Sequence, residues 1–268
     1  MKASAFLHSL VSAALLHTAA PIASSEEKPD PATPPTTSPV KTPAAPSDTK
    51  PAPAPPRRSL LKYTPPKSAG GGGPRVDGDG GSRAGGEKLP SIYVLAPKQI
   101  ALTTQAQPAL FWFQTEASNT GFELTVTEPK KAEPLLSLKG EDKQTGGTHS
   151  VSLAKHKVTL TPNVSYQWSV ALVPDPKNRS KDLVASGYVK RVEAPADLAA
   201  QIAKAAPADR AAIYAQAGYW YDALQSISIA IGEAAKNKDA NAIADLKKMR
   251  ASLLEQGDLK QAAAADRK

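Results

Sequence analysis

The sequence predicts an α+β protein in two folded parts, a β-sandwich followed by a small α-helical region, with a disordered stalk ahead of both. Three observations predict this order. Proline and glycine are concentrated ahead of residue 91, apolar and polar residues then alternate in short runs, and beyond residue 195 the apolar spacing becomes helical. The predicted segments are 1–25, 26–90, 91–193, 195–257 and 258–268.

Residues 1–25 have the composition of a secretory signal peptide. Lys2 precedes an apolar run that ends at Leu16, and mostly small residues follow up to Ser25. This run is shorter than the roughly 20 residues that span a bilayer. We therefore expect export through a cleaved signal peptide, a periplasmic or extracellular location, and no transmembrane segment in the mature chain.

Residues 26–90 are rich first in proline, alanine, threonine and serine and then in glycine. Such a composition has too little apolar surface to offset the entropy lost on ordering. We expect this segment to be a disordered Pro/Ala/Gly-rich linker that acts as a spacer.

Residues 91–193 contain short runs in which apolar residues alternate with polar ones, separated by turn residues. The predicted strands are residues 92–95, 109–114, 122–127, 135–139, 149–153, 164–173 and 187–192. Seven short strands at this spacing are typical of a β-sandwich.

A motif within this part narrows the prediction. Leu160, Pro162 and Tyr166 resemble the tyrosine corner of immunoglobulin-like and fibronectin III-like sandwiches, in which the tyrosine hydroxyl bonds back to the preceding loop backbone. Trp112, on an early strand, lies where such domains keep a core tryptophan. We expect an immunoglobulin/fibronectin III-like β-sandwich.

Residues 195–257 have helical signals. Leu198 and Ile202 mark one short helix, and Pro207 opens a second. A third has an apolar stripe, can be capped by Asp239 or Asn241 and can end at Gly257. The stripe consists of Ile243, Leu246, Met249, Leu253 and Leu254. The tail, residues 258–268, is expected to fray.

The run from Tyr214 to Leu224 resembles the helix-turn-helix core of a tetratricopeptide repeat, in which Gly218 and Ala223 allow two helices to pack closely. One repeat cannot build a solenoid with a peptide groove. We therefore expect a tetratricopeptide-like helical hairpin packed on the sandwich.

Three segments together resemble domain-of-unknown-function family 928. They are residues 108–112, residues 166–170 with 175–180, and residues 210–224. The family consists of exported bacterial proteins, many of them cyanobacterial. The resemblance implies bacterial export and carries no known activity.

Composition argues against several function classes. The absence of cysteine excludes disulfides and thiol chemistry, and the net charge of +8 is spread along the chain rather than clustered as in nucleic-acid-binding proteins. His149 and His156 are the only histidines beyond the signal segment, and no common catalytic motif is present. We expect no enzyme, no cofactor, no metal and no nucleic-acid partner.

The first candidate ligand-binding residues are Asp175, Arg179 and Asp182, in the loop between the last two predicted strands. A glycan hydrolase needs two carboxyl groups about 5 to 9 Å apart, which these aspartates could supply. The alternative is structural: Asp175 sets a turn, and Arg179 pairs with a carboxylate to tie the loop down.

The second candidates are Trp220, Tyr221 and Asp222 at the turn of the helical hairpin. Aromatic rings can carry the binding energy for a glycan or a peptide. Alternatively, these side chains pack against the neighbouring domain, with Arg210 or Arg250 paired to Asp222.

The sequence therefore favours a non-enzymatic binding or scaffolding module of the bacterial cell envelope, whose partner is an unidentified protein or polysaccharide. Two alternatives remain open: a carboxylate-dependent glycan hydrolase and a purely structural spacer.

Overall fold

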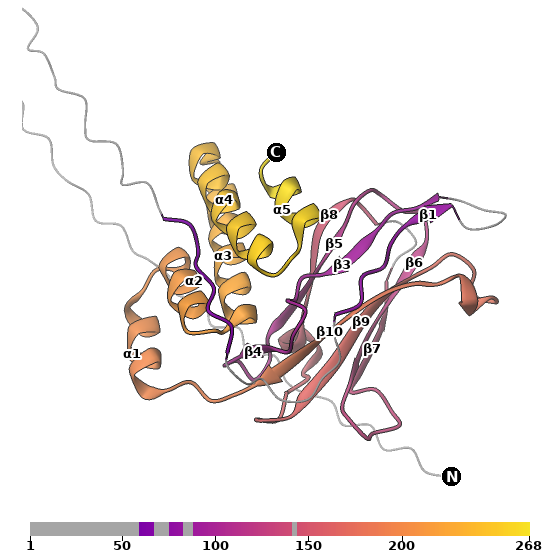
Figure 1. Ribbon diagram of the computed structural model, residues 1–268, viewed down its shortest axis with the longest axis horizontal. Helices are drawn as coiled ribbons and strands as arrows, with labels where there is room; N and C mark the ends of the chain where they lie inside the picture. The colour runs from indigo at the N-terminus through magenta and orange to yellow at the C-terminus, as the bar shows by residue number, and fades with distance from the viewer. Residues whose placement is uncertain (1–58, 67–74, 83–87, 141–143) are drawn as a thin grey trace, which may run out of the picture. The chain divides into compact units, whose positions relative to one another are not determined.

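The computed structural model describes residues 59–66, 75–82, 88–140 and 144–268. In these ranges the strands come first along the chain and the helices follow, so the predicted α+β order is confirmed (Figure 1). The predicted signal peptide, residues 1–25, and residues 26–58 of the predicted stalk lie outside the described residues.

The strands of the described ranges form two sheets and a short ribbon. The bounds are Gly81–Ser82 (β1), Lys88–Leu89 (β2), Ile92–Val94 (β3), Ala101–Thr103 (β4), Ala109–Gln114 (β5), Gly121–Thr127 (β6), Leu136–Lys139 (β7), Gly147–Ser152 (β8), Ser165–Val173 (β9) and Leu183–Arg191 (β10). The larger sheet has the order β4–β10–β9–β6–β7, with β4 parallel to β10 and the other neighbours antiparallel. The antiparallel smaller sheet has the order β3–β5–β8, and β1 pairs with β2. All seven predicted strands are present, and three short ones, β1, β2 and β4, were missed.

The two sheets share a core that their alternating side chains build. The rings of Trp112 on β5 and Phe122 on β6 lie 5.4 Å apart and so join the sheets, while Tyr166 and Trp168 on β9 are almost fully buried. The Tyr166 hydroxyl accepts a hydrogen bond from the backbone N–H of Thr161 at 3.0 Å. This is the contact that the motif predicted.

Five helices follow in the described ranges, and from α2 onward each packs on the next. Their bounds are Ala196–Lys204 (α1), Pro207–Gln216 (α2), Trp220–Lys236 (α3), Ala240–Gln256 (α4) and Lys260–Asp266 (α5). The Asp239 carboxylate accepts a hydrogen bond from the N–H of Ala242 at 2.9 Å, and α4 ends at Gly257. Both predicted ends of this helix are confirmed.

The last helix, α5, corrects the expectation that the tail frays. Ala262 and Ala263 are buried, and the Asp266 carboxylate pairs with the Arg250 guanidinium of α4 at 2.6 Å. Alanines contribute little hydrophobicity each, but their small size lets α5 approach α4 closely. The contact area and the ion pair together hold the tail.

Parts of the predicted linker also belong to the folded structure. Leu61 and Tyr63 are buried, and the Tyr63 ring lies edge-on to the Trp220 ring with centroids 5.0 Å apart. The backbone of Leu61 donates to Ser252 and accepts from Gln256, at 2.9 and 2.8 Å. Residues 59–66 are therefore held by α4, and their assignment to a disordered linker was wrong.

The segment 75–82 is also ordered. Arg75 pairs with Asp77 at 2.7 Å and donates to the backbone oxygens of Ala96 and Gly257, at 2.9 and 2.8 Å. One guanidinium thus connects the sheet region to the end of α4. The composition of residues 26–90, averaged over a long window, conceals these short anchored segments.

Candidate functional site

The loop with the first candidate residues connects β9 to β10. Asp175 accepts a hydrogen bond from the N–H of Lys177 at 3.0 Å and lies 3.6 Å from the Lys181 ammonium. Arg179 donates to Asp182 at 2.7 Å and to Glu123 on β6 at 2.6 Å. The loop is therefore tied to β6 by a chain of ion pairs, as the structural alternative predicted.

The two aspartates of this loop belong to separate ion pairs. Asp175 and Asp182 have different cationic partners, Lys181 and Arg179. Here the Arg179 guanidinium lowers the pKa of the neighbouring Glu123 below its usual range.

Trp220, Tyr221 and Asp222 begin α3, and all three are fully buried. The Trp220 indole N–H donates to the backbone oxygen of Leu95 at 2.8 Å. The Tyr221 hydroxyl accepts from the Trp168 indole at 2.8 Å and donates to the backbone oxygen of Tyr188. These side chains connect α3 to the sheets and leave no aromatic patch at the surface.

Asp222 has a polar partner other than the expected arginines. Its carboxylate accepts hydrogen bonds from the Thr104 backbone N–H at 3.0 Å and from the Thr104 hydroxyl at 2.5 Å. Arg210 donates to a backbone oxygen and Arg250 to Asp266, so the pairing predicted for them was wrong. Burial raises the pKa of Asp222 above its usual value, an effect that the hydrogen bonds from Thr104 oppose.

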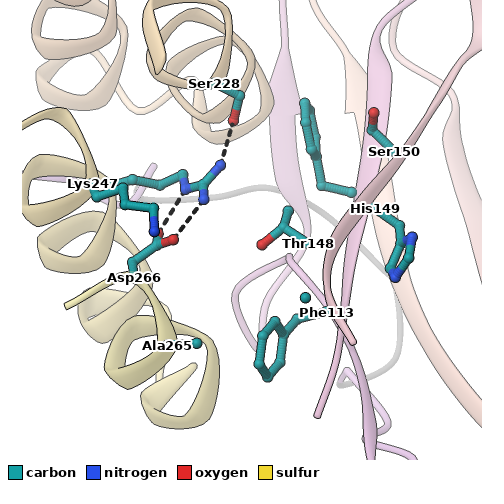
Figure 2. A pocket seen from close by; sticks show the side chains of 11 residues that line it. Phe113, Thr148, His149, Ser150, Ser228, Lys247, Ala265 and Asp266 are labelled. Carbon is teal, nitrogen blue, oxygen red and sulfur yellow. Dashed lines mark hydrogen bonds and ion pairs between the residues drawn. The ribbon is translucent and has the colours of Figure 1, made fainter. Parts of the chain in front are cut away.

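A cleft of about 390 Å³ lies between the smaller sheet and the helices (Figure 2). Its volume falls in the range of small-molecule sites, roughly 300–1,000 Å³. It is lined by Phe111, Phe113, Gly147, Thr148, His149, Ser150, Ser228, Lys247, Arg250, Ala265 and Asp266. The cleft therefore draws on β5, β8, α3, α4 and α5.

The sheet side of the cleft follows from strand register. Phe111 is paired with Ser150 and Phe113 with Thr148, and side chains two residues apart on a strand share a face. Both phenyl rings are largely buried, with exposed fractions of 7% and 5%. This face therefore presents phenyl surface beside two hydroxyl groups.

The helical side of the cleft carries charge. The Arg250 guanidinium binds both oxygens of Asp266, at 2.7 and 2.6 Å, and donates to the Ser228 hydroxyl at 3.3 Å (Figure 2). Lys247 lies one helical turn before Arg250. Within the described ranges no carboxylate forms an ion pair with Lys247.

His149 lies at the edge of the cleft, on the other side of β8 from the helices (Figure 2). Its ring stacks on Trp112 with centroids 5.2 Å apart, and its Nε2 is 2.8 Å from the backbone oxygen of Thr145. Asp266 is bound to Arg250. The two ordinary acid–base groups of the cleft are thus already held by structural partners.

A second hollow, of about 240 Å³, adjoins the cleft and shares Lys247 and Asp266 with it. It is also lined by Lys248, Arg267 and Lys268. Lys248 is 3.3 Å from Asp245, and Arg267 pairs with Glu255. Basic side chains therefore extend from the cleft along α4 and α5.

The cleft was not predicted, because its walls come from segments about 100 residues apart. One signal was available: the run Leu110-Phe-Trp-Phe113 is apolar on both faces of its strand. A strand of this kind is covered on both sides. This pattern indicated that something packs on the outer face of β5.

Fold and cleft together define an α+β protein with a cavity between a sheet and a helical layer. Residues 71–267 match the family described as Domain of Unknown Function (DUF928), so the chain belongs to this family, as its motifs predicted. The match extends beyond the three resembling segments at both ends and includes the anchored segment 75–82 and α5. No curated protein matches the sequence.

Two further observations concern metals and membranes. Among the residues that the structure describes, no three histidine, aspartate or glutamate side chains are grouped so that they could hold a metal ion. No helix in the same part of the chain has the length and apolarity needed to cross a membrane.

Proposed function

We propose that this protein is a non-enzymatic binding module exported to the bacterial cell envelope. The observation that carries the proposal is the cleft between the β3–β5–β8 sheet and helices α3 to α5. It combines phenyl surface, hydroxyl groups and a lysine without an ion-pair partner in the described ranges. A concave site with a few convergent polar groups is typical of ligand recognition.

Binding is favoured over catalysis by the state of the ionisable groups. A general acid or base needs access to its proton and a pKa close to the working pH. Asp266 is held by two hydrogen bonds from Arg250, and His149 is stacked on Trp112. Among the described residues no carboxylate forms an ion pair with Lys247, so its charge is available to attract a ligand.

We further propose that the β part is an immunoglobulin/fibronectin III-like sandwich. Supporting this, β3, β5 and β8 form one sheet, and β10, β9, β6 and β7 are neighbours in the other. The hydrogen bond from Thr161 to the Tyr166 hydroxyl adds support. The parallel strand β4 at the edge of the larger sheet extends this arrangement.

We also propose that the α2–α3 hairpin is tetratricopeptide-like, which the glycine between its helices supports. Gly218 joins the two helices with a φ of +87°, and a Cβ there would lie 2.9 Å from the backbone oxygen of Thr64. Glycine is therefore required both by conformation and by space. The segment 59–66 packs against this hairpin, since the Thr64 N–H donates to the Ala215 oxygen at 3.0 Å.

Export rests on the signal-like residues 1–25 and on the bacterial family that the chain resembles. A signal peptide predicts that the mature chain begins between about residues 21 and 26. Edman sequencing of the protein secreted by its own host tests this. An N-terminus at Met1 in the secreted protein would contradict it.

The binding proposal is tested with the full-length mature protein on envelope fractions from its host. Thr148→Trp places an indole in the cleft, whereas Lys155→Trp places one on an exposed residue away from it. We expect the wild type and Lys155→Trp to retain the same envelope component and Thr148→Trp to lose it. Retention of nothing by the wild type would favour a structural spacer, and conversion of the bound component would favour an enzyme.

A further inference from the structure

We infer that the cleft binds an acidic sugar residue, a hexuronate, with its carboxylate at Lys247 and Arg250 and its hydroxyls at Thr148, Ser150 and Ser228. The inference rests on the proposed binding function and names the ligand class of the same site. It depends on three properties of the cleft: net charge, free hydrogen-bonding groups, and an apolar wall next to polar ones.

The charge of the cleft matches that of one carboxylate. Arg250 is neutralised by Asp266, which leaves Lys247 as the single uncompensated charge among the lining residues. A carboxylate carries one negative charge at neutral pH, whereas a phosphate monoester carries about 1.5 to 2. The balance therefore favours a carboxylate over a phosphate.

Arg250 is positioned to bind the carboxylate of the hexuronate together with Lys247. Its guanidinium has five N–H groups, and three of them donate to Asp266 and Ser228. Two N–H groups thus have no partner among the described residues. The bidentate pair with Asp266 fixes the plane of the guanidinium, so these groups are held in place before a ligand arrives.

The hydroxyl groups of the cleft also have free capacity. The side chains of Thr148 and Ser150 form no hydrogen bond within the described part of the chain. Ser228 accepts one from Arg250 and retains its own O–H as a donor. Three hydroxyls on two walls suit a ligand that is itself ringed with hydroxyls.

The phenyl rings of Phe111 and Phe113 form the third property of the cleft, its apolar wall. A pyranose ring presents axial C–H groups on one face, and the negative face of an aromatic ring attracts such weakly positive hydrogens. Phe111 and Phe113 lie beside the hydroxyls of Ser150 and Thr148 in the strand register. An uronic acid has the apolar face, the hydroxyl rim and the carboxylate that these groups fit.

The test is an NMR titration of the full-length mature protein with galacturonate, glucuronate and mannuronate, and with galactose as the neutral control. We expect at least one hexuronate to shift the amide signals of Thr148 and Ser150, with galactose binding roughly ten-fold more weakly or not at all. Inorganic phosphate should compete poorly. Stronger binding of phosphate than of every hexuronate would overturn the inference.

Two lysine variants form a matched pair. Lys247→Gln removes the uncompensated charge of the cleft, and Lys248→Gln removes the next charge along the helix, which already pairs with Asp245. We expect roughly ten-fold weaker hexuronate binding for Lys247→Gln and less than two-fold change for Lys248→Gln. Equal binding by both variants would place the carboxylate elsewhere and overturn the inference.

The length of the saccharide distinguishes a free hexuronic acid from a residue of an acidic polysaccharide. If trigalacturonate binds more tightly than galacturonate, the ligand is a residue of an acidic polysaccharide that continues into the hollow lined by Lys248 and Arg267. Equal affinity indicates a free acid, and both results support a hexuronate site. If Thr148→Trp abolishes envelope capture while no hexuronate binds, the binding function stands and the inference fails.

Discussion

The helices meet the sheets at two places that are filled very differently. At the start of α3, the buried residues Trp220, Tyr221 and Asp222 use their polar atoms on partners in the sheet region. At α5, the same interface encloses a cleft lined by hydroxyls and charges. We call these the α3 contact and the α5 cleft.

The difference shows how the interface between the sheets and the helices can serve stability at one place and ligand binding at another. The α3 contact excludes water and satisfies its polar groups, which is the arrangement that contributes most to stability. The α5 cleft keeps a lysine and two hydroxyls without partners in the described ranges, which costs stability unless a ligand or water binds them. Substitutions at the two places should therefore affect different measurements.

The largest expected effect is that of Trp220→Ala. The change removes a fully buried indole and leaves the backbone oxygen of Leu95 without its donor. We expect the free energy of unfolding to fall by about 3–5 kcal/mol in urea denaturation. Leu60→Ala, at a side chain that is 64% exposed, should change it by less than about 0.5 kcal/mol. Equal effects would mean that the α3 contact does not dominate stability.

The second prediction concerns the ion pair that borders the α5 cleft. Asp266→Leu leaves the buried Arg250 without its carboxylate, and we expect a loss of about 3 kcal/mol in the same assay. The double variant Arg250→Met, Asp266→Leu should recover most of this loss, because a buried pair can often be replaced by apolar groups. If the double variant stays as unstable as the single one, the pair does more than hold α5 against α4.

The double variant also separates the effect of the ion pair on stability from its effect on ligand binding. It should restore stability without restoring hexuronate binding, since Arg250 is one of the proposed ligand contacts. Recovery of both properties would remove Arg250 from the proposed site while leaving Lys247 in it.

The third prediction is a pH dependence at the α3 contact. Asp222 has a pKa raised from 3.8, so the folded protein holds this proton more tightly than the unfolded chain. Its contribution to stability is therefore full below pH 3.8 and decreases as the pH rises through the folded-state pKa. Asparagine does not titrate at this position.

We expect Asp222→Asn to cost about 1–2 kcal/mol where Asp222 is protonated, because Asn cannot satisfy both Thr104 donors equally well. The difference between wild type and variant should shrink as the pH is raised. Denaturation of both proteins between pH of about 4 and 7 measures it. A difference that grows with pH would mean that the Thr104 hydrogen bonds outweigh burial.

Much of the fold could be predicted from local pattern. Alternation identified β9 and β10 because buried and less buried residues alternate over residues 165–170 and 187–190. The motif from Leu160 to Tyr166 identified a specific hydrogen bond, since its partners are only five residues apart. Predictions succeeded where the residues in contact are close in sequence.

The anchored segment 59–66 shows where local pattern fails. Leu61 and Tyr63 are bound by Ser252 and Gln256, which lie more than 190 residues further along the chain. Nothing in the surrounding proline-rich sequence indicates that partner. Helix α5 escaped notice for a related reason, because buried alanines are identified by the closeness of their neighbour rather than by hydrophobicity.

The aromatic candidates could have been judged better from helix geometry. Successive residues on a helix point about 100° apart, so Trp220, Tyr221 and Asp222 cannot form one patch. An element with large residues on several adjacent sides is usually buried. The ion pair in the loop between β9 and β10 was easier to predict, because Arg179 and Asp182 are only three residues apart.

The smallest effect is expected in the loop between β9 and β10. A substitution there also serves as a control for the α3 contact and the α5 cleft. Arg179→Gln removes the ion pairs to Glu123 and Asp182, but the Arg179 side chain is half exposed, so solvent and salt screen both pairs. We expect only a slight loss of thermal stability, one that disappears in concentrated sodium chloride, and unchanged hexuronate binding. Because Arg179 lowers the pKa of Glu123, the loss should be present at neutral pH and vanish as acid protonates Glu123. A decrease in ligand binding would instead show that the loop between β9 and β10 contributes to recognition.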